Sequence, residues 1–488
     1  MINKRLFQLC LSVSMGLLAG VQANPVAAIN STQLPTSPVV QDPAVPQQIF
    51  SLAQTLTGTV AGTRNLGANF GSAVAVNGDY LFVASANAAP NGVSNAGILS
   101  IYKKGETGNY VLSQAITSLL GQDDLLGSIG AIQSDGEWLF VTVGSAPFAS
   151  QDGPEARGGG LVQVYKLKKV DGVKTWIPHS QLHPQDLSIG DNFGARIALD
   201  AKAGWAFIAA ANQTQVTTDG EEALGGGAVY AYRYDSSSKQ WLPAPKITKP
   251  DGYKAVDTHF GISVAVQGAY ALIGSDNGNT SGNTGSVYSY TFISGRWVNN
   301  QIFQGDQPAL LDPVAQGDGF GTSVAIDGDW AVVSAPLDST LAETAGKIYF
   351  FKAKTTTGVK TWSKVNAVFP NLANKAGFLG AKVVIKGRNA FVSTLNRSDV
   401  DNRTYGGGVH LFQRSGDVWN HAETFGGGNS YSFAGADFAY SPSRDIIAVG
   451  SFSNLDYYLP QLPSARNFAN STVTASPSEV KIFKAVSE

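Results

Sequence analysis

Residues 320–336 read FGTSVAIDGDWAVVSAP, and this stretch is the clearest indication of the fold class. Two short apolar runs lie on either side of Asp327-Gly328-Asp329. Asp and Gly tolerate the positive φ that tight hairpin turns need, so the stretch predicts two antiparallel strands joined by a turn. Small apolar residues occupy successive positions in both runs, which is typical of strands that pack on both faces. The unit is therefore a buried hairpin.

Seven copies of this unit recur along the chain. Each begins with a first anchor, which is an aromatic residue or leucine followed by a small residue, and these anchors are 54 to 67 residues apart. Self-similarity at such a period indicates a repeat architecture. The first anchors are Phe70-Gly71, Leu126-Gly127, Phe193-Gly194, Phe260-Gly261, Phe320-Gly321, Leu379-Gly380 and Phe433-Ala434.

Two further strands are predicted in each unit. The third strand follows a glycine, the second anchor, and has an aromatic residue five positions later, as in Gly346 and Phe351. The fourth begins with an aromatic residue and has an apolar residue six positions later, as in Trp362 and Val368. Six copies of the fourth strand lie between the seven first anchors.

The missing seventh fourth strand is predicted at the other end of the chain. Phe50 and Leu56 show the same six-residue spacing just before the first unit. Pairing of this segment with the last third strand would leave no open interface between the first and last units. We therefore predict an all-β fold, a seven-bladed β-propeller with ring closure by an N-terminal strand.

In this repeated setting, residues 320–336 resemble an FG-GAP repeat, the unit of integrin α-chain propellers and of many bacterial exported proteins. The resemblance covers residues 50–488. Family members that bind calcium carry an acidic D-x-D-x-D-G-x-x-D loop in the first hairpin, whereas this chain has short turns such as Asn77-Gly78-Asp79. Calcium needs six to eight oxygen ligands. The integrin-like metal role is therefore not carried over, and no metal site or cofactor is predicted.

The composition of the chain limits the classes of function that it can have. Charged residues make up only 14% of the chain, against about 25% in typical globular proteins. The 55 glycines exceed the roughly 34 expected from average usage of about 7%, which indicates many tight turns. A formal net charge of −2 excludes the basic surface that a nucleic-acid-binding protein needs to neutralise phosphates.

The N-terminal region predicts export. Residues 1–23 contain Lys4 and Arg5, an apolar run of about 13 residues and the small-x-small pattern Val21-Gln22-Ala23, which is typical of a secretory signal peptide. The run is too short to span a membrane, so no transmembrane segment is predicted. Residues 24–48 are rich in proline and predict a linker. Residues 49–488 are assigned to the propeller.

The single cysteine, Cys10, lies inside the signal segment. A lipoprotein would acylate this residue, but the apolar sequence continues to Gly20, which favours ordinary cleavage. The mature chain would then contain no thiol and no disulfide. Large extracellular eukaryotic domains usually carry disulfides, so we expect a bacterial-type periplasmic or secreted protein, and a monomer.

Acidic residues precede several first anchors and are predicted to gather at one mouth of the propeller channel. Each carboxylate could accept backbone N–H groups in an Asx-type turn. Alternatively, the carboxylates could form a partial ring that attracts cations or polar ligands. The binding candidates on this basis are Asp124, Asp191, Asp257 and Asp318.

A long loop supplies two more candidates. The connection between positions 450 and 478 contains Tyr457 and Tyr458, and loops longer than about 12–15 residues are often functional. These aromatic residues could anchor a partner or only pack the loop against the ring. His259, His410 and His421 are assigned to different repeats and predict no cluster. No catalytic residues are predicted.

These observations favour an exported, non-enzymatic binding or adhesion module that presents one propeller face to a protein or glycan. The first alternative is a polysaccharide-active enzyme that uses two channel-mouth carboxylates as acid and base. The second is a structural component of an envelope assembly.

Overall fold

The computed structural model describes most of the predicted repeat region. The described residues are 49–60, 63–64, 69–93, 95–117, 132–144, 148–150, 153–156, 159–217, 219–250, 252, 258–276, 284–306, 317–341, 344–369, 377–395, 406–425, 434–451 and 478–486. They form strands almost throughout, with one 3₁₀ turn at Pro90–Gly92. No helix in these ranges is long and apolar enough to cross a membrane.

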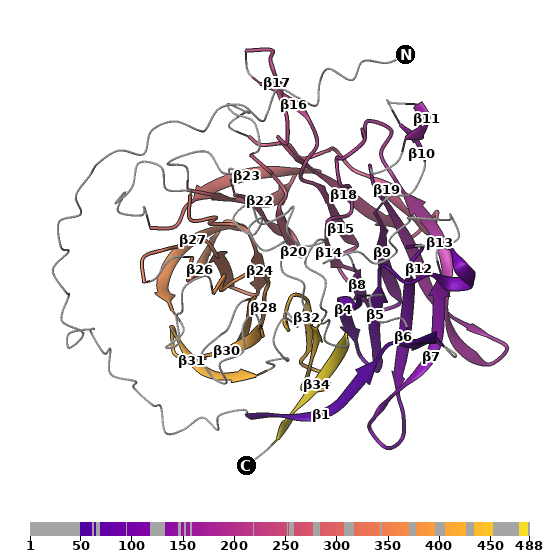
Figure 1. The fold of residues 1–488 in the computed structure, drawn as a ribbon. Helices are drawn as coiled ribbons and strands as arrows, with labels where there is room; N and C mark the ends of the chain where they lie inside the picture. Colours follow the sequence, from indigo (N-terminus) through magenta and orange to yellow (C-terminus); the bar gives the residue numbers. More distant parts are fainter. Residues whose placement is uncertain are drawn as a thin grey trace, which may run out of the picture. The chain divides into compact units, whose positions relative to one another are not determined.

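Within the described residues, the chain forms seven four-stranded antiparallel sheets, which we call blades 1 to 7 (Figure 1). Blade 1 consists of β4 (Phe70–Asn77), β5 (Tyr80–Ser85), β6 (Ile98–Lys104) and β7 (Tyr110–Thr117). Blade 2 consists of β8 (Ile132–Asp135), β9 (Trp138–Val143), β12 (Leu161–Val170) and β13 (Val173–Leu182). Blade 3 consists of β14 (Arg196–Asp200), β15 (Trp205–Ala210), β18 (Ala228–Asp235) and β19 (Gln240–Pro243). Blade 4 consists of β20 (Ser263–Gln267), β21 (Tyr270–Ser275), β22 (Ser286–Ile293) and β23 (Arg296–Phe303).

The remaining blades continue in chain order. Blade 5 consists of β24 (Val324–Asp327), β25 (Trp330–Ala335), β26 (Lys347–Thr356) and β27 (Val359–Val368). Blade 6 consists of β28 (Val383–Lys386), β29 (Asn389–Thr394), β30 (Gly408–Ser415) and β31 (Val418–Phe425). Blade 7 consists of β32 (Phe438–Ser441), β33 (Ile446–Ser451), β34 (Glu479–Val486) and β1 (Ile49–Thr57). Three two-stranded ribbons are β2 (Thr59–Val60) with β3 (Thr63–Arg64), β10 (Phe148–Ser150) with β11 (Gly153–Ala156), and β16 (Gln215–Val216) with β17 (Glu222–Ala223).

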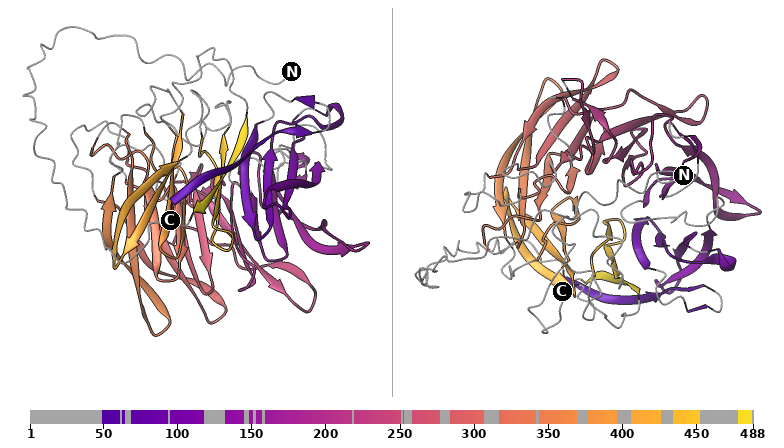
Figure 2. Two further views of the ribbon diagram at one scale, coloured as in Figure 1. Left: turned by 90° about the horizontal axis from the view of Figure 1, so that it is seen from below. Right: turned by 45° about the horizontal axis from the view of Figure 1, so that its top comes forward.

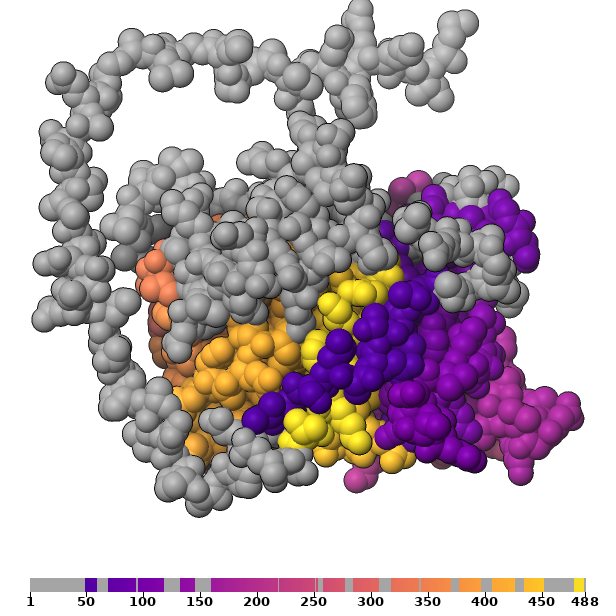
Figure 3. All heavy atoms as spheres, turned by 60° about the horizontal axis from the view of Figure 1, so that its bottom comes forward, coloured from indigo at the N-terminus to yellow at the C-terminus, as the bar shows by residue number. Residues whose placement is uncertain are grey.

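The outer strand of blade 7 comes from the N-terminal side of the chain. β1 pairs antiparallel with β34, with Phe50 opposite Ala485 and Leu56 opposite Val480. This is the strand pair that the six-residue spacing predicts. Figure 3 shows β1 in indigo lying along the yellow β34.

Hydrophobic clusters join each blade to the next. Among the described residues there are seven such clusters between successive blades. The cluster between blade 7 and blade 1 contains Leu56 and Val480 from one blade and Val74 and Leu81 from the other. Because the last blade packs on the first, the sheets form a seven-bladed propeller, which Figure 2 shows from two further directions.

The two sequence anchors contact each other between neighbouring blades. Phe193 and Phe260 donate their backbone N–H groups to the carbonyl oxygens of Gly159 and Gly226, at 2.8 and 3.0 Å. The second-anchor glycine lies so close to the next first anchor that a Cβ there would clash with backbone atoms. Such pairs are Gly160 with Phe193, Gly227 with Phe260, Gly285 with Phe320, Gly346 with Leu379, and Gly407 with Ala434.

The aromatic residue at the start of each fourth strand packs on the preceding blade. The ring of Trp241 lies 5.2 Å from that of Phe140, edge to face. Trp419 is fully buried and stacks on Phe350 at 4.6 Å with an interplanar angle of 7°. The aromatic position in the sequence pattern therefore serves contact between blades.

A polar side chain joins many of the neighbouring outer strands. We call the residue four positions after the fourth-strand aromatic residue the clamp residue. Three clamp residues are glutamines that accept the backbone N–H and donate to the backbone C=O of the next aromatic residue. They are Gln54 with Tyr110 (2.8 and 3.0 Å), Gln114 with Trp176 (3.1 and 2.8 Å), and Gln301 with Trp362 (2.7 and 2.8 Å).

Two other clamp residues make one bond each. Asn366 donates to the carbonyl oxygen of Trp419 at 3.0 Å, and Glu423 accepts the N–H of Phe50 at 3.2 Å. β1 is thus held by Glu423 of blade 6 and, through its own Gln54, is bonded to blade 1.

Replacing Gln301 with methionine is expected to lower the free energy of unfolding by about 1–3 kcal/mol, because two hydrogen bonds between blades 4 and 5 are lost. Denaturation in urea measures the effect. Ile302→Met on the same strand is the control, since Ile302 is 44% exposed. Equal midpoints for the two variants would contradict the stabilising role of the clamp.

The first strands line a central cavity of about 140 Å³. Arg196 and Lys382 contribute positive charge to its wall, and Asp437 contributes negative charge. Lys382 forms an ion pair with Asp437, whose other oxygen accepts the N–H of Val74 at 2.8 Å. Asp437 therefore links blades 6, 7 and 1 at the channel.

Candidate functional site

The structure describes two of the six predicted site residues. Asp191 and Asp318 are 4% and 3% exposed and belong to the connections that enter blades 3 and 5. The other four candidates, Asp124, Asp257, Tyr457 and Tyr458, lie outside the described residues. The binding role assigned to these six residues stays a prediction.

Asp191 closes a local turn. Its Oδ2 accepts the backbone N–H of Ser188 at 2.8 Å, and its own N–H faces the carbonyl oxygen of Ser188 at 3.3 Å. This bond goes to the N–H three residues earlier, so it differs from the Asx-type turn that the sequence leaves open as the structural alternative, which uses the N–H two residues further on. Asp318 makes the contact with Asx-turn spacing, to Phe320.

Asp318 is held by the backbone of its own blade. Its Oδ1 accepts the N–H of Phe320 at 2.9 Å, and its carbonyl oxygen accepts the N–H of Leu337 at 3.0 Å. Within the described part of the chain, Oδ2 is buried and has no hydrogen-bond partner.

Burial raises the pKa of Asp318 to about 6. The N–H of Phe320 opposes the shift, and the nearby Asp338, which is 3% exposed, adds to it. Lys347 lowers the pKa to a smaller extent. Asp318 therefore keeps its proton up to a higher pH than an ordinary aspartate does.

Beside Asp318, an ion cluster joins blade 4 to blade 5. Asp306, which follows β23, forms ion pairs with Lys347, at 2.9 Å, and with Lys364. Its backbone N–H donates to the hydroxyl of Tyr349 at 3.2 Å. Burial would raise the pKa of Asp306, but the hydrogen bonds from Lys364 and Lys347 outweigh it and lower the pKa.

The connection between blades 2 and 3 repeats this arrangement. Asp186 follows β13 and forms an ion pair with Lys246 at 2.7 Å. The hydroxyl of Tyr230 donates to Asp186 Oδ1 at 2.9 Å and accepts a hydrogen bond from Gln213 at 2.7 Å. In both places, an acidic connector residue is tied to a tyrosine and a lysine of the next blade.

The sequence analysis missed these two clusters, although it contains a signal for them. Tyr230, Tyr288 and Tyr349 each stand three residues after a second-anchor glycine. Their rings pack edge to face on the first-anchor phenylalanines, at centroid distances of 5.2 to 5.4 Å. A repeated tyrosine at one strand position, with an acidic residue in the preceding connector, would have indicated the contact.

The assignment of His410 and His421 to different repeats was wrong. Both lie in blade 6, on the paired strands β30 and β31, and His410 Nδ1 is 3.3 Å from His421 Nε2. The Thr424 hydroxyl is 3.0 and 2.9 Å from these two nitrogens. Adjacent strands place residues 11 positions apart side by side, which spacing alone did not indicate. In the ranges that the structure covers, no group of three or more His, Cys, Asp or Glu side chains could hold a metal ion.

Comparison with known proteins agrees with the repeat pattern. Residues 312–351 match the family model of the FG-GAP repeat. The described residues form a seven-bladed propeller, and this match lies on the first two strands of blade 5 and the start of its third. The chain is a seven-bladed β-propeller that carries an FG-GAP repeat.

Other comparisons add little. No curated protein matches the chain. A crystal structure from Bacteroides uniformis, provisionally assigned as a 6-phosphogluconolactonase, aligns with a TM-score of 0.41 and 14% identity, over 74% of this chain and 86% of the other. A second, from Bacteroides fragilis and with the same provisional assignment, aligns with a TM-score of 0.39 and 12% identity, over 74% and 85%. With TM-scores below 0.5, these likenesses carry no information about the activity of this chain.

The raised pKa of Asp318 predicts a pH dependence of stability. The folded state keeps the proton up to about pH 6, whereas an unfolded aspartate releases it near the ordinary aspartate pKa of 3.8. Ionisation of this group therefore lowers stability as the pH rises from about 4 to about 6, by roughly 3 kcal/mol. Asp318→Asn removes this loss. The free energy of unfolding of the wild type minus that of the variant should therefore become more negative as the pH rises across that range. A difference that stays constant with pH would contradict the assignment.

Proposed function

We propose that the protein is an exported binding module that presents one face of its propeller to a protein or glycan partner. The observation that carries the proposal is the anchoring of blade connectors by ion pairs, at Asp306 with Lys347 and at Asp186 with Lys246. Groups held in place before binding lose less conformational entropy when a partner arrives. Loops on a rigid scaffold are a common place for binding residues.

At the five anchor pairs that the structure describes, the connection into a first strand and the connection into a third strand start from the same face. The second-anchor glycines, which begin third strands, lie against the first anchors of the next blade. Both kinds of loop therefore start from neighbouring points. The variable loops of seven blades can contribute to one surface, which supports a large ligand rather than a small molecule.

A protein and glycan array probed with purified residues 24–488 tests the proposal. We expect selective binding that is lost when the connector anchor is broken by Asp306→Ala and retained in Asp417→Ala. The control removes another carboxylate that forms an ion pair with lysine, at Lys352, and that is exposed. Retained binding in Asp306→Ala would contradict a role for this face, and a variant lacking residues 452–470 tests the prediction for Tyr457 and Tyr458 separately.

One observation favours the alternative of a polysaccharide-active enzyme. A carboxyl group with a pKa of about 6, such as Asp318, is suited to act as a general acid. Its side chain is buried, however, and an acid must reach the leaving-group oxygen to transfer its proton. Turnover of a polysaccharide that disappears in Asp318→Asn, with folding retained, would support this alternative over the binding module.

Export is part of the proposal. It rests on the charged start, apolar run and cleavage pattern of residues 1–23. Expression in a bacterial host followed by fractionation and N-terminal sequencing tests it. A periplasmic or secreted protein that begins at Asn24 supports the proposal, and an uncleaved cytoplasmic protein contradicts it.

A further inference from the structure

The aromatic residue of each outer strand turns its backbone N–H and C=O away from its own sheet. In blade 4, Trp297 pairs with Phe292, whose N–H donates to Ala269 on the opposite side, at 2.8 Å. Phe292 and Trp297 are thus a non-hydrogen-bonded pair, and in such a pair the two backbone groups point outward. The equivalent bonds of Lys104, Leu167 and Ala353 show the same geometry opposite Tyr110, Trp176 and Trp362.

At three junctions a glutamine clamp bonds both outward groups, and at two others Asn366 or Glu423 bonds one of them. The junction between blades 3 and 4 differs, because the clamp position is Pro245. Proline has no carboxamide, and β19 ends at Pro243, although Ala244 and Ile247 still hydrogen-bond to β18 at Ala231 and Val229. In the described part of the chain, no side chain bonds the N–H and C=O of Trp297. At the junction of blades 2 and 3, the clamp position is occupied by Ser180. The neighbouring His179 packs edge-on against Trp138, with the ring centroids 4.9 Å apart.

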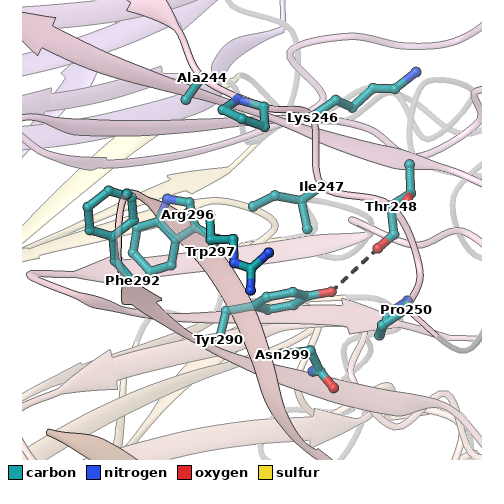
Figure 4. A pocket seen from close by; sticks show the side chains of 12 residues that line it. Ala244, Lys246, Ile247, Thr248, Pro250, Tyr290, Phe292, Arg296, Trp297 and Asn299 are labelled. Atoms are coloured by element: carbon teal, nitrogen blue, oxygen red, sulfur yellow. Dashed lines mark hydrogen bonds between the residues drawn. The ribbon is translucent and has the colours of Figure 1, made fainter.

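A cavity of about 260 Å³ lies at this place. Pro245 and Ile247 line it from blade 3, and Tyr290, Trp297 and Asn299 line it from blade 4. Figure 4 shows Ile247 and Thr248 on one side and the rings of Tyr290 and Trp297 on the other. The Tyr290 hydroxyl faces the carbonyl oxygen of Thr248 at 3.5 Å, so this ring is held in the wall.

We propose that this cavity is a recognition site for the side chain of a glutamine in an extended segment of a partner protein. The chain itself supplies the precedent, since Gln54, Gln114 and Gln301 bind the same two backbone groups at other junctions. In each case the glutamine arrives on a strand that runs beside the neighbouring blade. A partner strand beside β23 would bring its glutamine to Trp297 in the same way.

The chemistry selects a primary carboxamide. Such a group carries an N–H on the same side as its C=O, so it can donate to one backbone carbonyl and accept from one N–H of a single residue. A trans secondary amide, as in a peptide bond or an N-acetyl sugar, places these two groups on opposite sides. It can satisfy only one of the two groups of Trp297. The apolar part of the lining, such as Pro245 and Ile247, suits the methylene stem of glutamine, and Lys246 and Arg296 also line the cavity.

The probe is a blocked tripeptide, acetyl-Ala-Gln-Ala-N-methylamide, which holds one primary carboxamide. The matched control tripeptide replaces glutamine with norleucine, which keeps the apolar stem and lacks the carboxamide. Ligand-observed NMR titration of the full mature chain measures binding. We expect the glutamine peptide to bind at least tenfold more tightly than the norleucine peptide. Equal affinities would overturn the proposal, whatever the variants do.

Pro245→Gln tests the site from the protein side. The new glutamine should occupy the groups of Trp297 and weaken binding of the glutamine peptide at least tenfold. Leu242→Gln places the same carboxamide on an exposed position of β19, where 45% of the residue is accessible, and should leave binding unchanged. Undiminished binding to a folded Pro245→Gln chain would overturn the proposal. The site shares Lys246 with the Asp186 anchor, but Asp306 belongs to the junction of blades 4 and 5. Asp306→Ala should therefore not affect this peptide, and failure of the peptide test leaves the proposed function standing.

Discussion

Replacing Gly285 with alanine is expected to be among the most damaging single changes in the protein, costing about 3 kcal/mol or more of unfolding free energy. A Cβ at this position would lie 2.7 Å from the carbonyl carbon of Phe320 and 3.0 Å from the carbonyl oxygen of Ser275. Both neighbours are backbone atoms of packed blades, so neither can move aside without shifting a strand. Thermal and denaturant unfolding of the purified variant measure the loss.

Gly105→Ala is the control for this prediction. Neither Gly285 nor Gly105 has a φ in the left-handed region, so both substitutions avoid backbone strain. At Gly105 the added Cβ would lie 3.4 Å from the carbonyl oxygen of Asn109 and 3.7 Å from Val111 Cγ2, which are ordinary contacts. A Gly105→Ala chain should unfold within about 1 kcal/mol of wild type. Similar behaviour of the two variants would show that the anchors do not meet as described.

Trp419→Ala is expected to cost about 3–5 kcal/mol, because it removes a large buried ring and leaves a cavity. The indole is fully buried between blades 5 and 6, where it stacks on Phe350 and lies 5.6 Å from Trp330. The rigid sheets on both sides cannot close around the missing volume. Denaturant unfolding followed by tryptophan fluorescence and by far-UV circular dichroism measures the loss.

Val418→Ala, one residue earlier on β31, is the control. Val418 is 50% exposed, so its truncation should change the unfolding free energy by less than about 1 kcal/mol. If Trp419→Ala were equally mild, the fourth-strand aromatic residues could not be the main contacts between blades.

Much of the fold could be predicted because the unit is repeated. One copy of the stretch at residues 320–336 would indicate only a hairpin, but seven copies in the same order define the four strands of every blade. The spacing shared by Phe50–Leu56 and the other fourth strands even identified the strand that pairs with β34. In a repeat protein each unit has the same neighbours, so local patterns also describe contacts between units.

The candidate site was less accessible to sequence reasoning. Asp318 was singled out for its place before an anchor, yet its raised pKa comes from burial and from Asp338, 20 residues further on. Asp306, Lys347 and Lys364 were not considered at all, because they come from different strands and meet only when blades 4 and 5 pack. His410 and His421 were missed for the same reason within one blade.

Spacing and composition along the chain were enough to predict the strand pattern, the number of units and export. Burial, the pairing of charges and the backbone groups without a partner depend on how the blades pack, and these features appear first in the folded chain. The open junction at Pro245 illustrates the difference. Proline is visible in the sequence, but its consequence depends on the outward N–H and C=O of Trp297, which the packing of the next blade brings beside it.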